Sequence, residues 1–259
     1  MLQPVQDADA WIGPGNARTL NHCSLRQDGR ALLMGRRHWL KVYDTATGRV
    51  KSRIGPIGDP PRDDKPSRGG IDVSRINQNG TLAALSQKDY GDVPIWDLEA
   101  GRQLGKIATR FPEAALLFGG DPDTLYTGTQ DEVACWDART LQNRWRLAVH
   151  PKLPMPAQLA FSGDFSVLAV TLTPDSVSLL NPETKEEIIR LRHASPHPIH
   201  SLALSPDGTR LAVLCLGHIV QLWDLAHLRT LLAERKLDWS GPRAKVSSPH
   251  KWRILPEPE

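Results

Sequence analysis

Residues 199–224 read IHSLALSPDGTRLAVLCLGHIVQLWD and contain three short apolar runs separated by two turns. The first run ends at the turn Ser205-Pro206-Asp207-Gly208, and the second ends at Gly217-His218. The third run closes with Trp223-Asp224. Because Asp-Gly supplies the positive φ of a tight hairpin turn, three strands within this short stretch predict an antiparallel meander.

The same pattern recurs along the chain, each time with an Asp or Asn after the third run. We call these residues the repeat marks, and they stand 53, 40, 44 and 43 residues apart: Asp44, Asp97, Asp137, Asn181 and Asp224. The long first spacing contains the Pro/Gly-rich segment 55–70, which predicts a surface loop. A period of about 40–45 residues with four short strands is typical of β-propeller blades. We therefore expect an all-β fold built from antiparallel four-stranded blades.

The residues that set this period also resemble a known family. The turn at 205–208, followed by Trp223-Asp224, looks like a WD repeat, and Asn79-Gly80 with Trp96-Asp97 follows the same pattern. The segment 231–239, LLAERKLDW, resembles the closing segment of bacterial WD-repeat proteins, many of which carry a Ser/Thr kinase domain. The resemblance implies a WD-repeat propeller over most of residues 18–232.

Two features depart from that family. Many WD repeats place an Asp six residues before the Trp, in a buried polar network, and none stands at the equivalent positions here: Arg37, Tyr90, Gln130, Pro174 and Gly217. We therefore expect apolar packing between sheets to stabilise the blades. Five repeats are recognisable where the family usually has seven, and 259 residues allow about six.

The sequence leaves three alternatives for how the ring of blades is completed. In the first, residues 1–16 complete another blade. In the second the ring is incomplete, and in the third the chain is part of a longer ancestor. An incomplete ring would expose strand edges, on which self-association is expected. We divide the chain into a WD-repeat-like propeller over residues 1–239 and an extended tail over 240–259. Residues 226–236 contain leucines on one side of a helical pattern and predict a short helix.

The formal charge of +3 hides an asymmetry along the chain. Residues 17–69 hold 12 Lys and Arg against 5 Asp and Glu, whereas the remainder holds 20 against 24. A basic patch could attract a nucleic acid. Because the positive residues are spread over several strands and loops, we favour a solvated outer face over a nucleic-acid site.

The cysteines and the apolar runs indicate the cellular compartment of the protein. Cys23, Cys135 and Cys215 form no CxxC pair, and their odd number argues against a disulfide framework. The longest apolar stretch, residues 211–223, is too short and too polar to span a bilayer. Residues 1–16 show no basic-then-apolar secretion signal. These features predict a cytoplasmic protein without a membrane partner.

No motif of a known nucleophile, phosphate-binding loop, metalloprotease or kinase occurs in the chain. His193, His197 and His200 lie close together but lack a neighbouring carboxylate or Cys, so we expect no metal site. Residues 44–48 and 136–145 also resemble blades of pyrroloquinoline-quinone enzymes. A quinoprotein-like enzyme, or a small-ligand binder using the central channel, is therefore the alternative. Because no cofactor constellation is visible, we expect neither catalytic residues nor a cofactor.

Candidate binding residues lie in the turns between the second and third strands. In propellers these turns reach the rim of one face, beside the connections between blades. Exposed Trp, Tyr and Arg on a rim are typical interface anchors, although a solvated loop accounts for each residue singly. We therefore expect a non-catalytic scaffold that binds protein partners, in bacterial signalling as the resemblance implies. Its candidate binding residues are Arg36, Arg37, His38, Trp39, Lys88, Tyr90, Asp131 and His218.

Overall fold

The computed structural model describes most of the repeat region. Its described residues are 22–26, 29–36, 39–55, 57, 71–87, 91–109, 114–149, 153–192, 197–217 and 219–235. Residues 1–16, most of the predicted loop 55–70 and the predicted tail 240–259 lie outside these ranges. The boundary proposed at residue 239 therefore stays a prediction.

The described residues form five antiparallel sheets and one helix. The first four sheets have four strands each, and the fifth has three. Their bounds are β1 (His22–Leu25), β2 (Ala31–Arg36), β3 (Trp39–Asp44), β4 (Val50–Ile54); β5 (Ile71–Ile76), β6 (Leu82–Gln87), β7 (Asp92–Asp97), β8 (Arg102–Ala108); β9 (Ala115–Phe118), β10 (Thr124–Gly128), β11 (Glu132–Asp137), β12 (Asn143–Ala148); β13 (Leu159–Phe161), β14 (Leu168–Thr173), β15 (Ser176–Leu180), β16 (Glu187–Arg192); β17 (Ile199–Leu204), β18 (Arg210–Cys215), β19 (Ile219–Asp224) and α1 (Leu225–Glu234).

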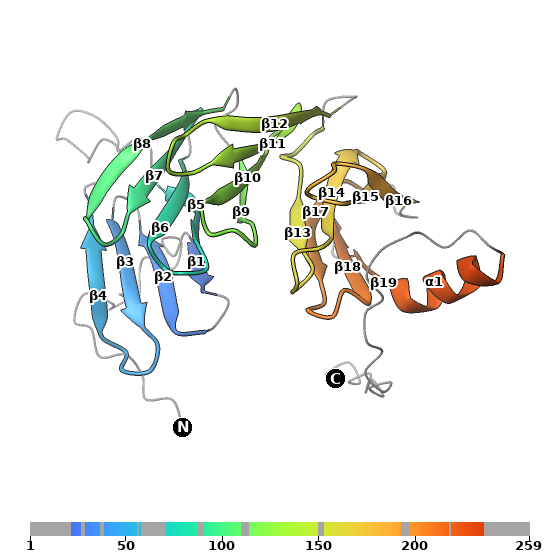
Figure 1. Ribbon diagram of the computed structural model, residues 1–259, viewed down its shortest axis with the longest axis horizontal. Coiled ribbons are helices and arrows are strands. Elements are labelled where there is room, and N and C mark those ends of the chain that lie inside the picture. The colour runs from blue at the N-terminus through green and yellow to red at the C-terminus, as the bar shows by residue number, and fades with distance from the viewer. Residues whose placement is uncertain are drawn as a thin grey trace.

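The sheets follow one another along an arc (Figure 1). Each sheet is a meander in which every strand pairs with its sequence neighbour. The first strands β1, β5, β9, β13 and β17 lie next to one another in that order, so they form one side of the arc. The first and fifth sheets stand at the two ends of the arc (Figure 1). The expectation of an all-β fold with repeated antiparallel sheets is confirmed, with five sheets among the described residues.

The repeat marks hold the turn that follows the third strand. In the second sheet, Asp97 Oδ1 accepts the backbone N–H groups of Glu99 at 3.0 Å and Ala100 at 2.9 Å. Asp137 and Asn181 accept two backbone N–H groups in the same way, and Asp44 accepts that of Thr47. Such side-chain bonds are the reason that Asp and Asn favour turns. The repeat marks therefore have a structural role.

The fifth mark begins a helix instead of a turn. In the first four sheets, the residue four positions after the mark has a positive φ: Gly48, Gly101, Leu141 and Lys185. The equivalent residue in the fifth repeat is Leu228, which lies inside α1. Asp224 Oδ1 caps this helix by accepting the N–H of His227 at 2.8 Å. The segment LAHLRTLLAE is rich in strong helix formers, so it takes the place of a fourth strand. The short helix expected near the C-terminus is confirmed.

Apolar clusters fill the space between neighbouring sheets. Leu33 and Leu40 of the first sheet pack with Ile71 and Leu85 of the second, and all four are buried. Equivalent clusters join the second sheet to the third, the third to the fourth and the fourth to the fifth. Burying apolar area between stacked sheets is therefore the main term that holds the arc together.

Candidate functional site

One face of the arc, which we call the connection face, combines two kinds of segment. They are the turns between the second and third strands of each sheet and the connections from one sheet to the next. Of the eight predicted binding residues, Arg36, Trp39 and Asp131 lie at turns of this face. Arg37, His38, Lys88, Tyr90 and His218 lie outside the described residues.

Arg36 and Trp39 flank the first of these turns. Arg36 ends β2 and Trp39 begins β3, and the two are paired in register. The Trp39 side chain is 39% exposed, and the guanidinium carbon of Arg53 lies 4.4 Å from the centre of its ring. Arg53 therefore covers part of the ring through a cation–π contact, and the remaining surface of Trp39 faces solvent.

Asp131 is held in the turn between β10 and β11. Thr129 Oγ1 donates a hydrogen bond to Asp131 Oδ1 at 2.9 Å. The backbone oxygen of Asp131 accepts the N–H of Val149 at 2.7 Å, which ties the turn to the end of β12. These bonds give Asp131 a structural role in shaping the connection face.

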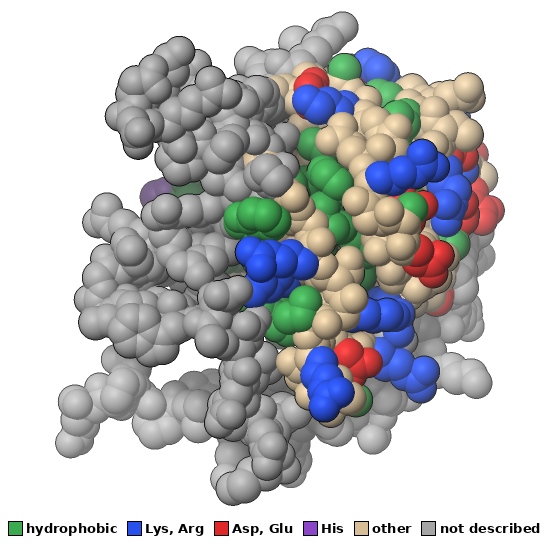
Figure 2. Space-filling view, turned by 90° about the vertical axis from the view of Figure 1, so that its left-hand side faces the viewer, with side chains coloured by type: hydrophobic (Ala, Val, Ile, Leu, Met, Phe, Trp, Pro, Cys, Tyr) green, Lys and Arg blue, Asp and Glu red, His purple; other side chains and the backbone are tan. Residues whose placement is uncertain are grey.

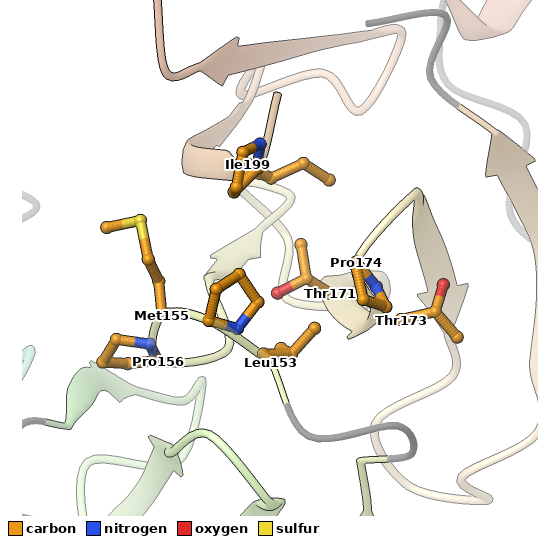
Figure 3. A pocket seen from close by; sticks show the side chains of 9 residues that line it. Leu153, Met155, Pro156, Thr171, Thr173, Pro174 and Ile199 are labelled. Atoms are coloured by element: carbon orange, nitrogen blue, oxygen red, sulfur yellow. The ribbon is translucent and has the colours of Figure 1, made fainter. Parts of the chain in front are cut away.

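Beside this turn lies a groove that the sequence did not single out. It is a small, open, mostly apolar depression at the junction of the third, fourth and fifth sheets. Figure 3 shows Met155, Pro156 and Leu153 on one side of it, with Thr171, Thr173 and Pro174 opposite. The lining residues are Leu153, Pro154, Met155, Pro156, Thr171, Thr173, Pro174, Pro198 and Ile199.

Backbone hydrogen bonds fix the wall formed by residues 153–156. The N–H of Leu153 donates to Gln130 O at 2.8 Å, and the N–H of Ala157 donates to Thr129 O at 2.9 Å. On the far side, the N–H of Gln158 donates to Thr171 Oγ1 at 2.8 Å. Since four of the nine lining residues are prolines, whose φ is already fixed, the groove is formed before any ligand enters it.

A charged pair stands beside the groove. Arg192 Nε donates to Asp175 Oδ2 at 2.7 Å, and Thr173 Oγ1 donates to Asp175 Oδ1 at 3.0 Å. The Arg192 guanidinium, followed by the Thr173 hydroxyl, lowers the pKa of Asp175 below its usual range. The groove thus combines an apolar floor with a polar edge.

The acidic residues with shifted pKa values are explained by turns and ion pairs. The backbone N–H of Thr140, with the Arg144 guanidinium, lowers the pKa of Asp137 to about 2. Burial raises the pKa of the Cys135 thiol, which makes its reactive thiolate form scarce. Within the described residues, no three His, Cys, Asp or Glu side chains lie together in a group that could hold a metal ion.

Charges of both signs share the surface at the outer end of the first sheets. Figure 2 shows Lys and Arg side chains beside Asp, Glu and hydrophobic side chains on the described part of this face. On the described part of this face, the Lys and Arg side chains do not gather into one patch (Figure 2). Among the described helices, none is long and apolar enough to cross a membrane.

Comparison with known proteins agrees with the architecture. No family model matches the chain. A WD repeat-containing protein WDS homolog of Arabidopsis thaliana is 27% identical over 139 residues, which is 51% of this chain. The match spans about a quarter (25%) of that relative's length. Together with the repeated four-stranded sheets, this distant similarity is consistent with a WD-like propeller.

Proposed function

We propose that the chain is a non-catalytic scaffold that binds a protein partner on the connection face. The observation that carries the proposal is the preformed groove, in which Pro154, Met155 and Pro174 offer an apolar surface next to the Asp175–Arg192 pair. An apolar side chain of the partner would enter the groove, while neighbouring polar groups meet the rim. The distant WD-repeat relative supports this type of function, because WD repeats serve as binding platforms.

The finer setting of this function is also part of the proposal. The resemblance of residues 231–239 to bacterial WD-repeat proteins supports a place in bacterial signalling. Cys23, Cys135 and Cys215 are not joined in disulfides, which supports a reducing compartment such as the cytoplasm. The exposed Trp39 and its partner Arg53 would extend the binding surface along the connection face.

The test begins with capture of partners on the purified chain, identified by mass spectrometry, and continues with measured affinities. Met155→Lys and Thr173→Lys place a charge in the groove, so each should weaken binding of the identified partner at least tenfold. Lys185→Glu alters a turn on the opposite face and serves as the control, with unchanged affinity expected. If the unaltered chain and all three variants bind the partner with equal affinity, the partner binds outside the groove.

A parallel assay separates the scaffold from the alternative enzyme. A ligand that binds only the folded state raises the melting temperature, and the rise grows with the logarithm of the ligand concentration once that concentration exceeds the dissociation constant. Pyrroloquinoline quinone with Ca²⁺ should therefore leave the melting temperature unchanged if the chain is a scaffold. A rise that grows with ligand concentration, together with turnover of an alcohol or sugar, would support a quinoprotein-like enzyme instead of a scaffold.

A further inference from the structure

We call the side of a sheet that packs on the following sheet its forward face. The third strand contributes two residues to this face, four and two positions before the repeat mark. In the first four sheets these residues are apolar and at most 4% exposed: Leu40 and Val42, Val93 and Ile95, Val133 and Cys135, Val177 and Leu179. Each pair lies in the apolar clusters that join its sheet to the following one. The two positions are therefore covered wherever another sheet follows.

The fifth sheet keeps the same residue types at these positions, but its forward face is exposed. The two equivalent residues, Val220 and Leu222, are 66% and 58% exposed. Leu225 of α1 packs into the cluster between the fourth and fifth sheets, which is on the other side of the fifth sheet. The residues across the sheet from Val220 and Leu222 are uncharged as well: Leu214 and Ala212 of β18, and Ser201 and Ala203 of β17. A contiguous exposed surface of this composition marks a site of contact.

The size of this forward face limits what can cover it. Its three strands of six residues span roughly 15 Å by 20 Å, or roughly 300 Å², at the usual strand spacing and rise. A stable contact between two separate proteins buries about 800 Å² on each partner, so this face alone is too small for one. A segment of the same chain needs far less contact, because a flexible tether gives an effective concentration on the order of millimolar.

The chain continues past α1, which contacts β18 and lies at the same end of the arc as the fifth sheet (Figure 1). Within the following residues, 251–255 read KWRIL, where Trp252 and Ile254 alternate with Lys251 and Arg253. Such alternation is typical of an extended segment with one apolar and one polar side. Residues 235–250, which join α1 to this run, can span roughly 50 Å when extended, more than twice the length of the face. The run can therefore reach the whole forward face of the fifth sheet.

We propose that the segment 251–255 of the same chain covers the forward face of the fifth sheet. Trp252 and Ile254 pack on Val220 and Leu222, while the charged residues between them point to solvent. The contact places apolar side chains on the same two positions that the following sheet covers in the first four sheets. Its driving force is the removal of apolar surface from water on both sides of the contact.

A cysteine placed at position 220 reports whether the face is covered. Val220→Cys in the full chain should be alkylated about tenfold more slowly than the same substitution combined with Trp252→Lys and Ile254→Lys. A tenfold difference corresponds to a segment that is bound about nine-tenths of the time. Leu231→Cys, at an exposed position of α1, is the matched control and should react equally fast with and without the two lysines. Peptide mapping by mass spectrometry separates these sites from the native thiols of Cys23, Cys135 and Cys215.

Sedimentation of the same proteins separates a contact within one chain from a contact between copies. The Val220→Cys chain should be a monomer at the concentrations at which its cysteine is protected. Protection that rises with concentration, together with a mass above the monomer, would show that a second copy covers the face and would overturn the proposal. Equal protection with and without the two lysines would assign the cover to another part of the chain. Fast alkylation of position 220 in the full chain would show that the face is open, and it would overturn the proposal as well.

Discussion

The indole Nε1 of Trp136 donates a hydrogen bond to Thr127 Oγ1 at 3.0 Å, from β11 to the neighbouring strand β10. The equivalent indoles, Trp96 and Trp223, have a buried Nε1 without an acceptor among the described residues. Their acceptor is missing because Leu85 and Val213 stand where the third sheet has Thr127. The third sheet therefore has one polar contact at a position where the second and fifth sheets, with a Trp at the same place, have apolar packing.

Thr127→Val should lower the free energy of unfolding by about 1–2 kcal/mol, because it leaves a buried N–H without a partner while preserving volume. Urea denaturation followed by Trp fluorescence measures the change. The converse variant Val213→Thr offers an acceptor to Trp223 and should raise the free energy of unfolding by about 1 kcal/mol. An unchanged free energy of unfolding in Thr127→Val would mean that the indole bond contributes nothing.

Lys185→Gly should stabilise the fold by about 0.5–1 kcal/mol. Lys185 is exposed and has φ 66°, a conformation in which a side chain is strained and Gly is not. Thermal unfolding is a suitable measurement. Leu141 has φ 63° but contributes to the core between the second and third sheets, so Leu141→Gly should instead destabilise. Equal effects at the two positions would contradict the role given to Leu141 packing.

Asp137 should make the turn after β11 sensitive to acid. Its pKa is lowered to about 2 by the Thr140 N–H and by Arg144, so its contribution to stability is complete above about pH 4. That contribution is lost as the pH falls through about 2, because the folded state must then bind the proton. Asp137→Asn keeps the turn acceptor, as Asn181 does in the fourth sheet, and should flatten this part of the stability profile. An unchanged profile would assign the acid sensitivity to other carboxylates.

Asp224→Ala should loosen α1 without unfolding the arc. The substitution removes the cap at the N–H of His227 and should cost about 1 kcal/mol. Hydrogen exchange of the α1 amides should accelerate by roughly fivefold, while exchange in β13–β16 stays unchanged. Asp224→Asn is the control, because its amide oxygen can still accept the bond. Faster exchange throughout the fourth sheet would show that the cap also supports the arc.

Only part of the candidate site could be predicted from the sequence. The connection face follows from the order of strands, so the places of Trp39 and Asp131 were predictable from the turns. The groove was not, because its lining comes from segments near residues 153–156, 171–174 and 198–199 that meet only after three sheets have packed. The clustering of prolines at these equivalent connection and turn positions was the one available signal.

The sequence by itself determined the repeated meander, its turns and the short helix that follows Asp224. These features depend on interactions within a few residues, such as Asp-capped turns and alternating apolar side chains, and five copies make the pattern unmistakable. Only the tertiary structure decided which apolar side chains are covered. Val177 and Val220 occupy the same place in the repeat, yet one is buried and the other is 66% exposed. The physical reason is that burial of a sheet face depends on a neighbouring sheet, which no local pattern specifies.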